Sequence, residues 1–264
     1  MVRHSPHTPA PAAGTPPDPD APAGRPGVRL YLEHALGPGQ QVTLPPEAAH
    51  YLFTVMRLGS GDRVALFNGQ HGEWAAELSQ QGKRGGVALC LYQTAAQRMP
   101  ADLWLLFAPL KKARTDFLVE KATELGAARL VPVQTDHTNA ERIRRDRLTA
   151  QAREAAEQCG ATHVPDVDDL RPLAAVLDGW PAGRTLYWAD ESRPDAPPPD
   201  TPGPAAILIG PEGGFSPAER ARLAALPHVR PMGLGPRILR AETAAVAALV
   251  LWQARLGDWA KPAP

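Results

Sequence analysis

The stretch ILIGPEGGFSPAER, residues 207–220, decides the fold class and indicates where a site could form. Its unbroken apolar start is typical of a strand buried on both faces, as in a parallel sheet covered by helices. The run stops at Gly210, and a loop with two more glycines and one carboxylate, Glu212, leads to SPAE (216–219). That motif predicts a capping box with proline at the first helical position. A loop so poor in side chains is either a tight turn or a place where a ligand contacts the backbone.

A second bend, GLGPRILRAET (233–243), has the same design, with an apolar strand before a Gly/Pro turn and a helix after it. Two such loops at one sheet edge could hold a flat ligand through backbone groups. Arg237 and Arg240 could contact an anion or a charged transition state. The alternative is that both arginines are simply solvated at a helix start. The helix dipole disfavours cations there, so Arg240 and Glu242 could instead bind a ligand or pair with each other.

Around these bends the chain alternates strands and helices, which predicts a parallel α/β sheet. The expected strands are 102–110, 128–134, 184–190, 205–210 and 228–235. The expected helices are 115–126, 145–160, 216–226 and 240–257, and the first two close at glycines in the position that a C-cap favours. A phosphate loop and a dinucleotide fingerprint are both excluded, because GPEGG lacks the lysine and GLGPRI (233–238) lacks the third glycine.

The first part of the chain has a different pattern. Residues 28–97 contain short apolar runs separated by turn residues, one helical pattern at 45–58, and Asn68-Gly69, a strong hairpin signal. These features predict a small β-barrel or sandwich domain, with a boundary near 97–101 and a second domain over 101–260. Residues 1–27 hold eight of the 30 prolines and are expected to form a disordered tail.

Composition narrows the classes of partner. Lys+Arg and Asp+Glu are 28 each, so the formal net charge is zero and any anionic partner must be recognised by a local patch. The chain has no run of 18 apolar residues, no secretory signal and no metal-ligand motif, so we expect no membrane and no metal. Cys90 and Cys159 lie far apart in sequence and outside any CxxC pair, which favours a reducing cytoplasm.

Four motifs then give a resemblance. LIGPEGGFSPAE (208–219) and LGPRILRAETA (234–244), with KATELGAARLVPV (121–133) and REAAEQCG (153–160), closely resemble the RsmE family of ribosomal RNA uridine N3-methyltransferases, in the SPOUT superfamily. The resemblance implies an α/β C-terminal SPOUT domain with a parallel sheet and a trefoil knot, preceded by a PUA-like β-barrel that helps hold RNA. It also implies S-adenosylmethionine as cofactor, ribosomal RNA of the small (16S) subunit as partner, and a homodimer.

The resemblance also carries site residues. The cofactor would contact three loops, at Leu186, Ile209, Gly210, Glu212, Gly213, Gly214, Leu234, Gly235, Ile238 and Leu239. The uracil must lose its N3 proton, and a guanidinium beside its carbonyl oxygens would stabilise the resulting anion, so the catalytic candidates are Arg240, then Arg237, with Glu242 orienting an arginine or taking the proton.

RNA contact would come from basic side chains. The candidates are Arg29, Lys111, Lys112 and Arg114, with the run RIRRDR (142–147). The alternative for each charge run is a helix face that is exposed to solvent and contacts no partner. The target base must be single-stranded or splayed out.

Other functions compete with this one. A SPOUT enzyme could methylate a different base or a ribose 2′-hydroxyl, and a non-catalytic RNA-binding module could keep the same fold. The chain also departs from the family pattern at two places. Thr135-Asp136-His137-Thr138 stands where Ser-Glu-Arg is common, and Ala161-Thr162 stands where an arginine often follows.

Overall fold

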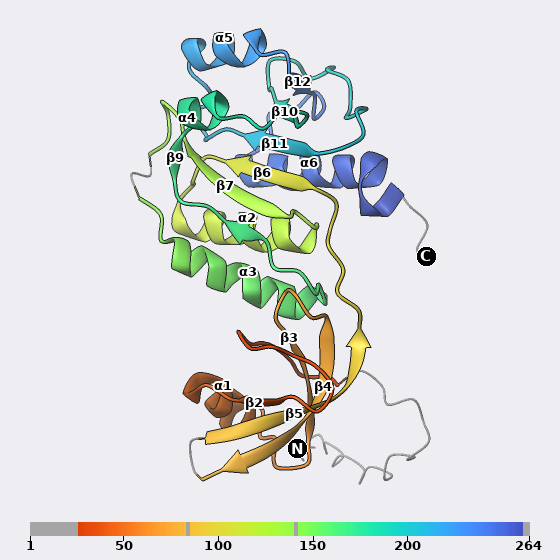
Figure 1. Ribbon diagram of the computed structural model, residues 1–264. Coiled ribbons are helices and arrows are strands. Elements are labelled where there is room, and N and C mark those ends of the chain that lie inside the picture. The colour runs from red at the N-terminus through yellow and green to blue at the C-terminus, as the bar shows by residue number, and fades with distance from the viewer. Residues whose placement is uncertain (1–25, 83–84, 140–141, 261–264) are drawn as a thin grey trace, which may run out of the picture.

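The computed structural model describes residues 26–82, 85–139 and 142–260, which form two units stacked end to end (Figure 1). The predicted tail, 1–27, lies almost entirely outside these ranges. Within them, no helix has both the length and the apolar character needed to cross a membrane.

The first unit is a small sheet that curls around its own core, as the sequence predicts. Its described strands run in the order β1-β3-β4-β5-β2, with β1 and β3 parallel and the other neighbours antiparallel. The elements are β1 (Arg29–Tyr31), β2 (Gln41–Thr43), α1 (Pro46–His50), the π-helix η1 (Tyr51–Val55), β3 (Arg63–Phe67), β4 (Glu73–Gln81) and β5 (Gly85–Ala95). The hairpin predicted at Asn68-Gly69 joins β3 to β4, and Gly69 has the positive φ of 83° that such a turn favours.

The second unit is the parallel α/β sheet predicted from the strand and helix alternation. Its strand order is β12-β10-β11-β6-β7-β8, β9 pairs with β7, and every pairing is parallel. The strands are β6 (Leu103–Phe107), β7 (Arg129–Gln134), β8 (Asp166–Val167), β9 (Arg171–Pro172), β10 (Thr185–Ala189), β11 (Ala205–Ile209) and β12 (Val229–Met232). The helices are α2 (Lys112–Glu124), α3 (Arg145–Cys159), α4 (Leu173–Asp178), α5 (Pro217–Ala225), α6 (Ala241–Leu256) and the 3-10 turn η2 (Asp258–Ala260).

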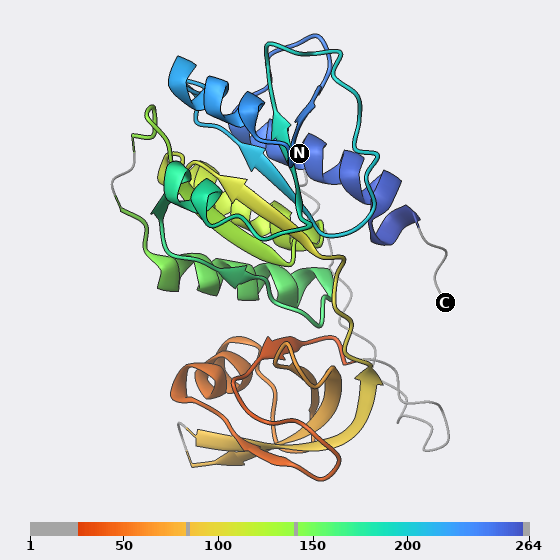
Figure 2. The same cartoon turned by 45° about the horizontal axis from the view of Figure 1, so that its top comes forward.

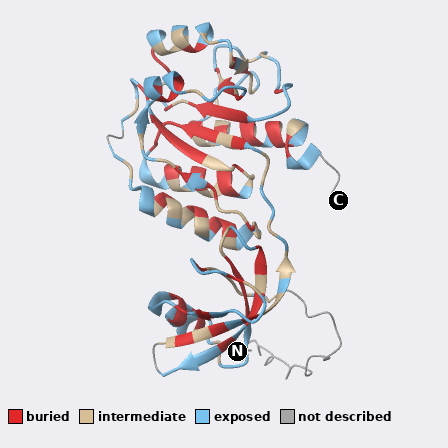
Figure 3. Ribbon diagram, viewed as in Figure 1, coloured by how far each residue is buried: buried red, intermediate tan, exposed pale blue. Residues whose placement is uncertain are grey.

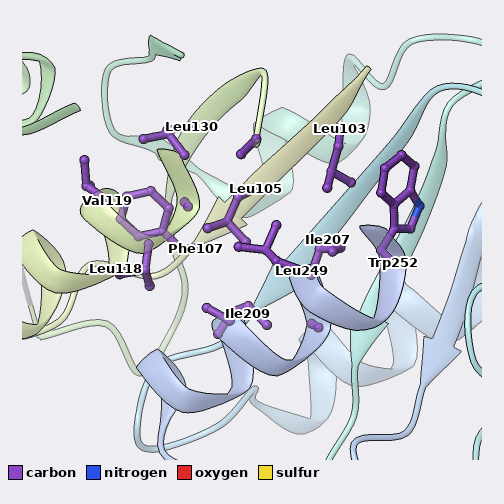
Figure 4. Close-up of a cluster of buried hydrophobic side chains, with 14 of the residues drawn as sticks. Leu103, Leu105, Phe107, Leu118, Val119, Leu130, Ile207, Ile209, Leu249 and Trp252 are labelled. Carbon is purple, nitrogen blue, oxygen red and sulfur yellow. The ribbon is translucent and has the colours of Figure 1, made fainter. Parts of the chain in front are cut away.

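Both faces of this sheet are covered, which explains the unbroken apolar run in β11. Ile207 and Ile209 face a cluster formed with α2, α3 and α6, whereas Leu208 faces a second cluster under α4 and α5. Figure 4 shows the first cluster, with Trp252 of α6 at one end of it. The central strands are correspondingly buried along their length (Figure 3).

Helix boundaries follow local chemistry where the sequence carried a clear signal. α2 and α3 end before Gly126 and Gly160, whose φ values of 74° and 78° lie in the left-handed region. The capping box is present at Ser216 and Glu219. The sequence analysis missed β8, β9 and α4, because these elements have only two, two and six residues and carry little periodicity.

Arg29 joins the two units, so its expected role as an RNA contact is wrong. Its guanidinium pairs with the fully buried Glu73 and lies 3.7 Å from the centre of the Phe67 ring. It also donates to three carbonyl oxygens around the end of α3, those of Ala156, Glu157 (3.3 Å) and Ala161 (2.5 Å). A cation at the carbonyl end of a helix is favourable, and burial leaves this one out of reach of a phosphate.

Other contacts reinforce the same junction. The Glu157 carboxylate accepts the Tyr31 N–H at 2.7 Å, and burial raises the pKa of this carboxyl. Thr162 accepts the Arg98 N–H at 2.9 Å. Of the two residues that depart from the family pattern, Thr162 supplies a side-chain link to the Arg98 backbone, whereas Ala161 contributes only its main-chain carbonyl oxygen.

We predict that Arg29→Ala lowers the free energy of unfolding by about 3–5 kcal/mol, because it removes the cation from a buried carboxylate. Urea unfolding of the full chain would measure the loss. The comparison variant is Arg153→Ala, which removes an exposed pair with Glu33 and a cation–π contact with Tyr31 across the same junction and should cost less than about 2 kcal/mol. Equal losses in the two variants would contradict a special role of Arg29 as the clamp between the barrel and the end of α3.

Candidate functional site

The carboxyl ends of β10, β11 and β12 surround a cavity of about 460 Å³. Three loops line it, after Ala189, after Ile209 and after Met232, so the two bare bends of the sequence do come together. Its size is within the range of small-molecule sites. The β10–β11 connection lies beside the segment that follows β12 in both views (Figures 1 and 2), and a Cβ on Gly233 would overlap the Pro194 carbonyl oxygen.

Nine of the ten expected cofactor residues line this cavity, and they lie on two of the three loops. They are Ile209, Gly210, Glu212, Gly213, Gly214, Leu234, Gly235, Ile238 and Leu239. Leu186 was placed wrongly: it is fully buried in the cluster on the α4 and α5 face of the sheet. The strand β10 reaches the cavity only at its end, where Ala189, Asp190 and Glu191 line the wall.

The shape of the 209–215 loop requires its glycines. A Cβ on Gly210 would lie 2.7 Å from the ring of Phe215, which is itself buried against the edge of the Trp188 ring. Gly214 has a φ of 68°, which few other residues adopt without strain. The loop is therefore closed on its protein side by Phe215 and left open on its cavity side.

Glu212, on the cavity rim, belongs to a three-residue ionic cluster. Arg114 Nη1 donates to Glu212 Oε1 at 2.9 Å, and Arg114 Nε lies 3.9 Å from Glu242 Oε1. The Arg114 guanidinium, expected to contact RNA, thus connects α2 with the loop and with α6. The other oxygen of Glu242, Oε2, is buried and has no hydrogen-bond partner among the described residues.

Arg237 and Arg240 both line the cavity and are exposed. Within the described ranges, neither guanidinium has a hydrogen-bond or ion-pair partner. The possible pair between Arg240 and Glu242 does not form, since Glu242 is held by Arg114. Ile238, between the two arginines, is 86% exposed, so this bend presents two unpaired cations and an uncovered apolar side chain.

Ion pairs occupy much of the remaining positive charge. In the run 142–147, three arginines are paired: Arg144 with Asp146, Arg145 with Asp169, and Arg147 with Asp116. Lys111 and Lys112, at the start of α2, are exposed and have no ion pair in the described part of the chain. These two lysines are the stronger candidates for contact with an anionic polymer.

Two further groups lie beside the cavity: Asp190, which the sequence analysis missed, and His137, which it named only as part of a departure from the family pattern. Asp190 is buried and accepts from Arg220 Nη2 at 2.5 Å and from Ser192 Oγ at 2.8 Å. His137, which lies in a loop after β7, contacts the carbonyl oxygens of Gly213 and Gly214. The position of Asp190 at a parallel strand end was a usable signal, whereas His137 was marked only by the departure from the family pattern at 135–138.

Comparisons with known proteins agree with this architecture. Residues 97–253 match the RNA methyltransferase domain family, and residues 44–88 match the RNA methyltransferase PUA domain family. A ribosomal RNA small subunit methyltransferase E from Bacillus subtilis (strain 168) is 32% identical over 77% of this chain and 86% of its own length. A protein of that name from Rickettsia conorii is 28% identical over 84% of this chain and 93% of its own length.

A solved structure is similar over nearly the same span. The ribosomal RNA small subunit methyltransferase E from Neisseria gonorrhoeae, bound to S-adenosyl methionine, superposes with a TM-score of 0.79 at 29% identity. The superposition covers 88% of this chain and 99% of that one.

We predict that Gly210→Ala destabilises the protein by about 1–3 kcal/mol, because the new methyl group would overlap the Phe215 ring in a packed interior. Thermal and urea unfolding would measure the change. Gly37→Ala is the matched control, since no atom lies within 4 Å of the added Cβ, and it should stay within about 0.5 kcal/mol of wild type. A similar loss at both positions would show that the Phe215 ring is not the reason why residue 210 must be glycine.

Proposed function

Since the chain belongs to the RsmE family of RNA methyltransferases, we propose that it methylates N3 of one uridine in the 16S RNA of the small ribosomal subunit. The chain is an S-adenosylmethionine-dependent ribosomal RNA methyltransferase. What we propose is the base that it modifies, a uridine, and the atom that receives the methyl group, N3. One observation carries it: three loops meet around one cavity whose rim presents two unpaired arginines.

The cavity fits this cofactor. It has room for a small molecule, and its walls are largely backbone and apolar side chains. The Glu212 carboxylate in this lining is already paired with Arg114. When bound, S-adenosylmethionine supplies an electrophilic methyl group on a sulfonium centre. We assign its binding to the loops at 189–191, 209–214 and 234–239.

The chain's own residues must then handle the charge on the base. Loss of the N3 proton leaves negative charge on the two carbonyl oxygens of uracil. Arg240 offers a planar fork of donors for these oxygens, and it makes no competing ion pair within the described residues. Arg237 is the second candidate for the same charge. Glu242 does not line the cavity and its Oε2 is buried, so we propose that it orients an arginine rather than taking the proton.

We expect RNA to approach the cavity from the side of the molecule where the carboxyl ends of the strands lie. α1 and the start of α2 face the same side as the strand ends (Figures 1 and 2). Lys111 and Lys112 stand next to the Arg114 cluster at that edge. We propose that they contact phosphates while the barrel holds the surrounding RNA and the target base is splayed into the site.

A homodimer is part of the proposal. The outer side of α6 carries Val250, 36% exposed, and α2 carries Phe117, 41% exposed. These side chains and the exposed Ile238 would be covered by a second copy. The proposed location is the cytoplasm, where ribosomal RNA is modified.

We also propose the trefoil knot of the SPOUT superfamily. β11 lies between β10 and β6, whereas β12, which follows it in sequence, lies on the far side of β10. The segment leaving β12 then passes against Pro194 of the β10–β11 connection. This crossing supports threading of one connection through the other.

We predict that Arg240→Ala lowers kcat by about 10²–10³-fold, because a charge that develops in the reaction loses its fixed donor. The measurement is methylation of small subunits and of free 16S RNA, followed by mass mapping of the modified nucleosides. Arg240→Lys should recover only part of the rate, since lysine lacks the planar fork. Arg222→Ala, on α5 and paired with Asp178, is the control with full activity.

The same map separates the alternatives. A methyl group on another base or on a ribose oxygen would replace the N3 assignment, and the absence of any transfer together with RNA binding would indicate a non-catalytic module. An unchanged rate for Arg240→Ala would remove the catalytic role of this arginine.

We predict that Lys111→Ala and Lys112→Ala each weaken RNA binding uniformly across sequences and reduce the salt slope of log Kd by about one, because each loses a phosphate contact. RNA titrations at several salt concentrations would measure the slope. Lys121→Ala is the control, since Glu120 and Glu124 already neutralise that lysine. A slope that falls equally in all three variants would argue against these contacts.

A further inference from the structure

The four residues after β7, Thr135–Thr138, lie against the outside of the loop that we assign to the cofactor. His137 Nδ1 is 3.0 Å from the Gly213 carbonyl oxygen and 3.1 Å from that of Gly214. Because a carbonyl oxygen only accepts, Nδ1 carries the proton in this arrangement. The contact is close: a Cβ on Gly213 would lie 3.2 Å from the Cβ of His137. His137 is exposed and is not among the residues that line the cavity, so its imidazole contacts the loop from outside the cavity.

Asp136 makes a second attachment to the same loop. Its backbone N–H donates to Glu219 Oε1 at 2.9 Å, and Ser216 Oγ donates to Asp136 Oδ2 at 2.5 Å. Ser216 and Glu219 also form the capping box of α5. The residues 213–219 are thus held at both ends by a segment that lies outside the cavity.

The 135–138 segment is itself a closed turn. The Thr138 N–H donates to the Thr135 carbonyl oxygen at 3.1 Å, and the Thr135 N–H donates to Thr138 Oγ1 at 2.9 Å. The two threonine hydroxyls are 2.8 Å apart and share a hydrogen bond. A turn closed in this way presents Asp136 and His137 in fixed positions.

We propose that His137, with Asp136, is a positioning residue that sets the affinity of the chain for S-adenosylmethionine. A loop that binds through backbone groups has few side chains of its own to hold it, so it must be ordered by its surroundings or pay for ordering when the ligand arrives. The hydrogen bonds from His137 order Gly213 and Gly214 before binding. The proposal rests on the assignment of the cavity to this cofactor.

Calorimetric titration of the full chain with S-adenosylmethionine tests the proposal. His137→Ala should weaken Kd by roughly threefold to tenfold, the effect of one or two lost hydrogen bonds. His137→Asn should stay within about twofold of wild type, because its amide nitrogen stands where Nδ1 stood, whereas His137→Gln places its nitrogen one bond further and should resemble alanine.

Hydrogen exchange of the cofactor-free protein gives a readout that does not depend on binding. Amides of residues 209–216 should exchange faster in His137→Ala and His137→Gln than in wild type and His137→Asn, while amides of the barrel stay unchanged. Equal Kd values and equal exchange in all four proteins would overturn the role of His137 and leave the proposed function intact. A wild-type chain that does not bind S-adenosylmethionine would instead overturn the cavity assignment, and this inference with it.

Discussion

The structure depends on one constraint: a recognition surface made of backbone must be bare on one side and held in shape from the other. The 209–215 loop meets both demands. Gly210 leaves room for the packed Phe215 ring and Gly214 supplies a left-handed backbone conformation, while the capping box and the turn at 135–138 hold the loop from outside the cavity. The parallel sheet makes this possible, because it brings three strand ends to one edge and buries the strands behind them on both faces.

The charged side chains near the site are arranged so that most of them pair with one another. The chain has equal numbers of acidic and basic residues, and those around the site are mostly committed to one another. Arg114 holds two carboxylates, and Arg220 holds Asp190 and Glu191. What distinguishes the rim is therefore Arg237 and Arg240, which have no ion pair within the part of the chain that the structure describes. Because the net charge of the protein is zero, these local cations determine where a negatively charged group binds favourably.

Local chemistry made much of this predictable. Gly126, Gly160 and the SPAE motif mark helix ends through backbone conformation and capping, which act over a few residues, and the strand at 205–210 is marked by its apolar run. Arg29 could not be placed in this way, because its partners lie on β4 and 127 to 132 residues along the chain. The contact from His137 spans 76 residues and leaves no local trace. Leu186 was misplaced because alternation along β10 turns its side chain to the other face.

The clamp between barrel and α3 also gives the enzyme a fixed reach. Arg29 and the Tyr31 backbone bind the end of α3 directly, so the two units are not joined by a tether alone. An RNA held on the barrel, as proposed above, would therefore lie at a fixed distance from the cavity. Only a folded RNA whose extruded nucleotide stands at that separation from its gripped portion can be served. Under the proposed function, this fixed distance between barrel and cavity would help select one uridine among many.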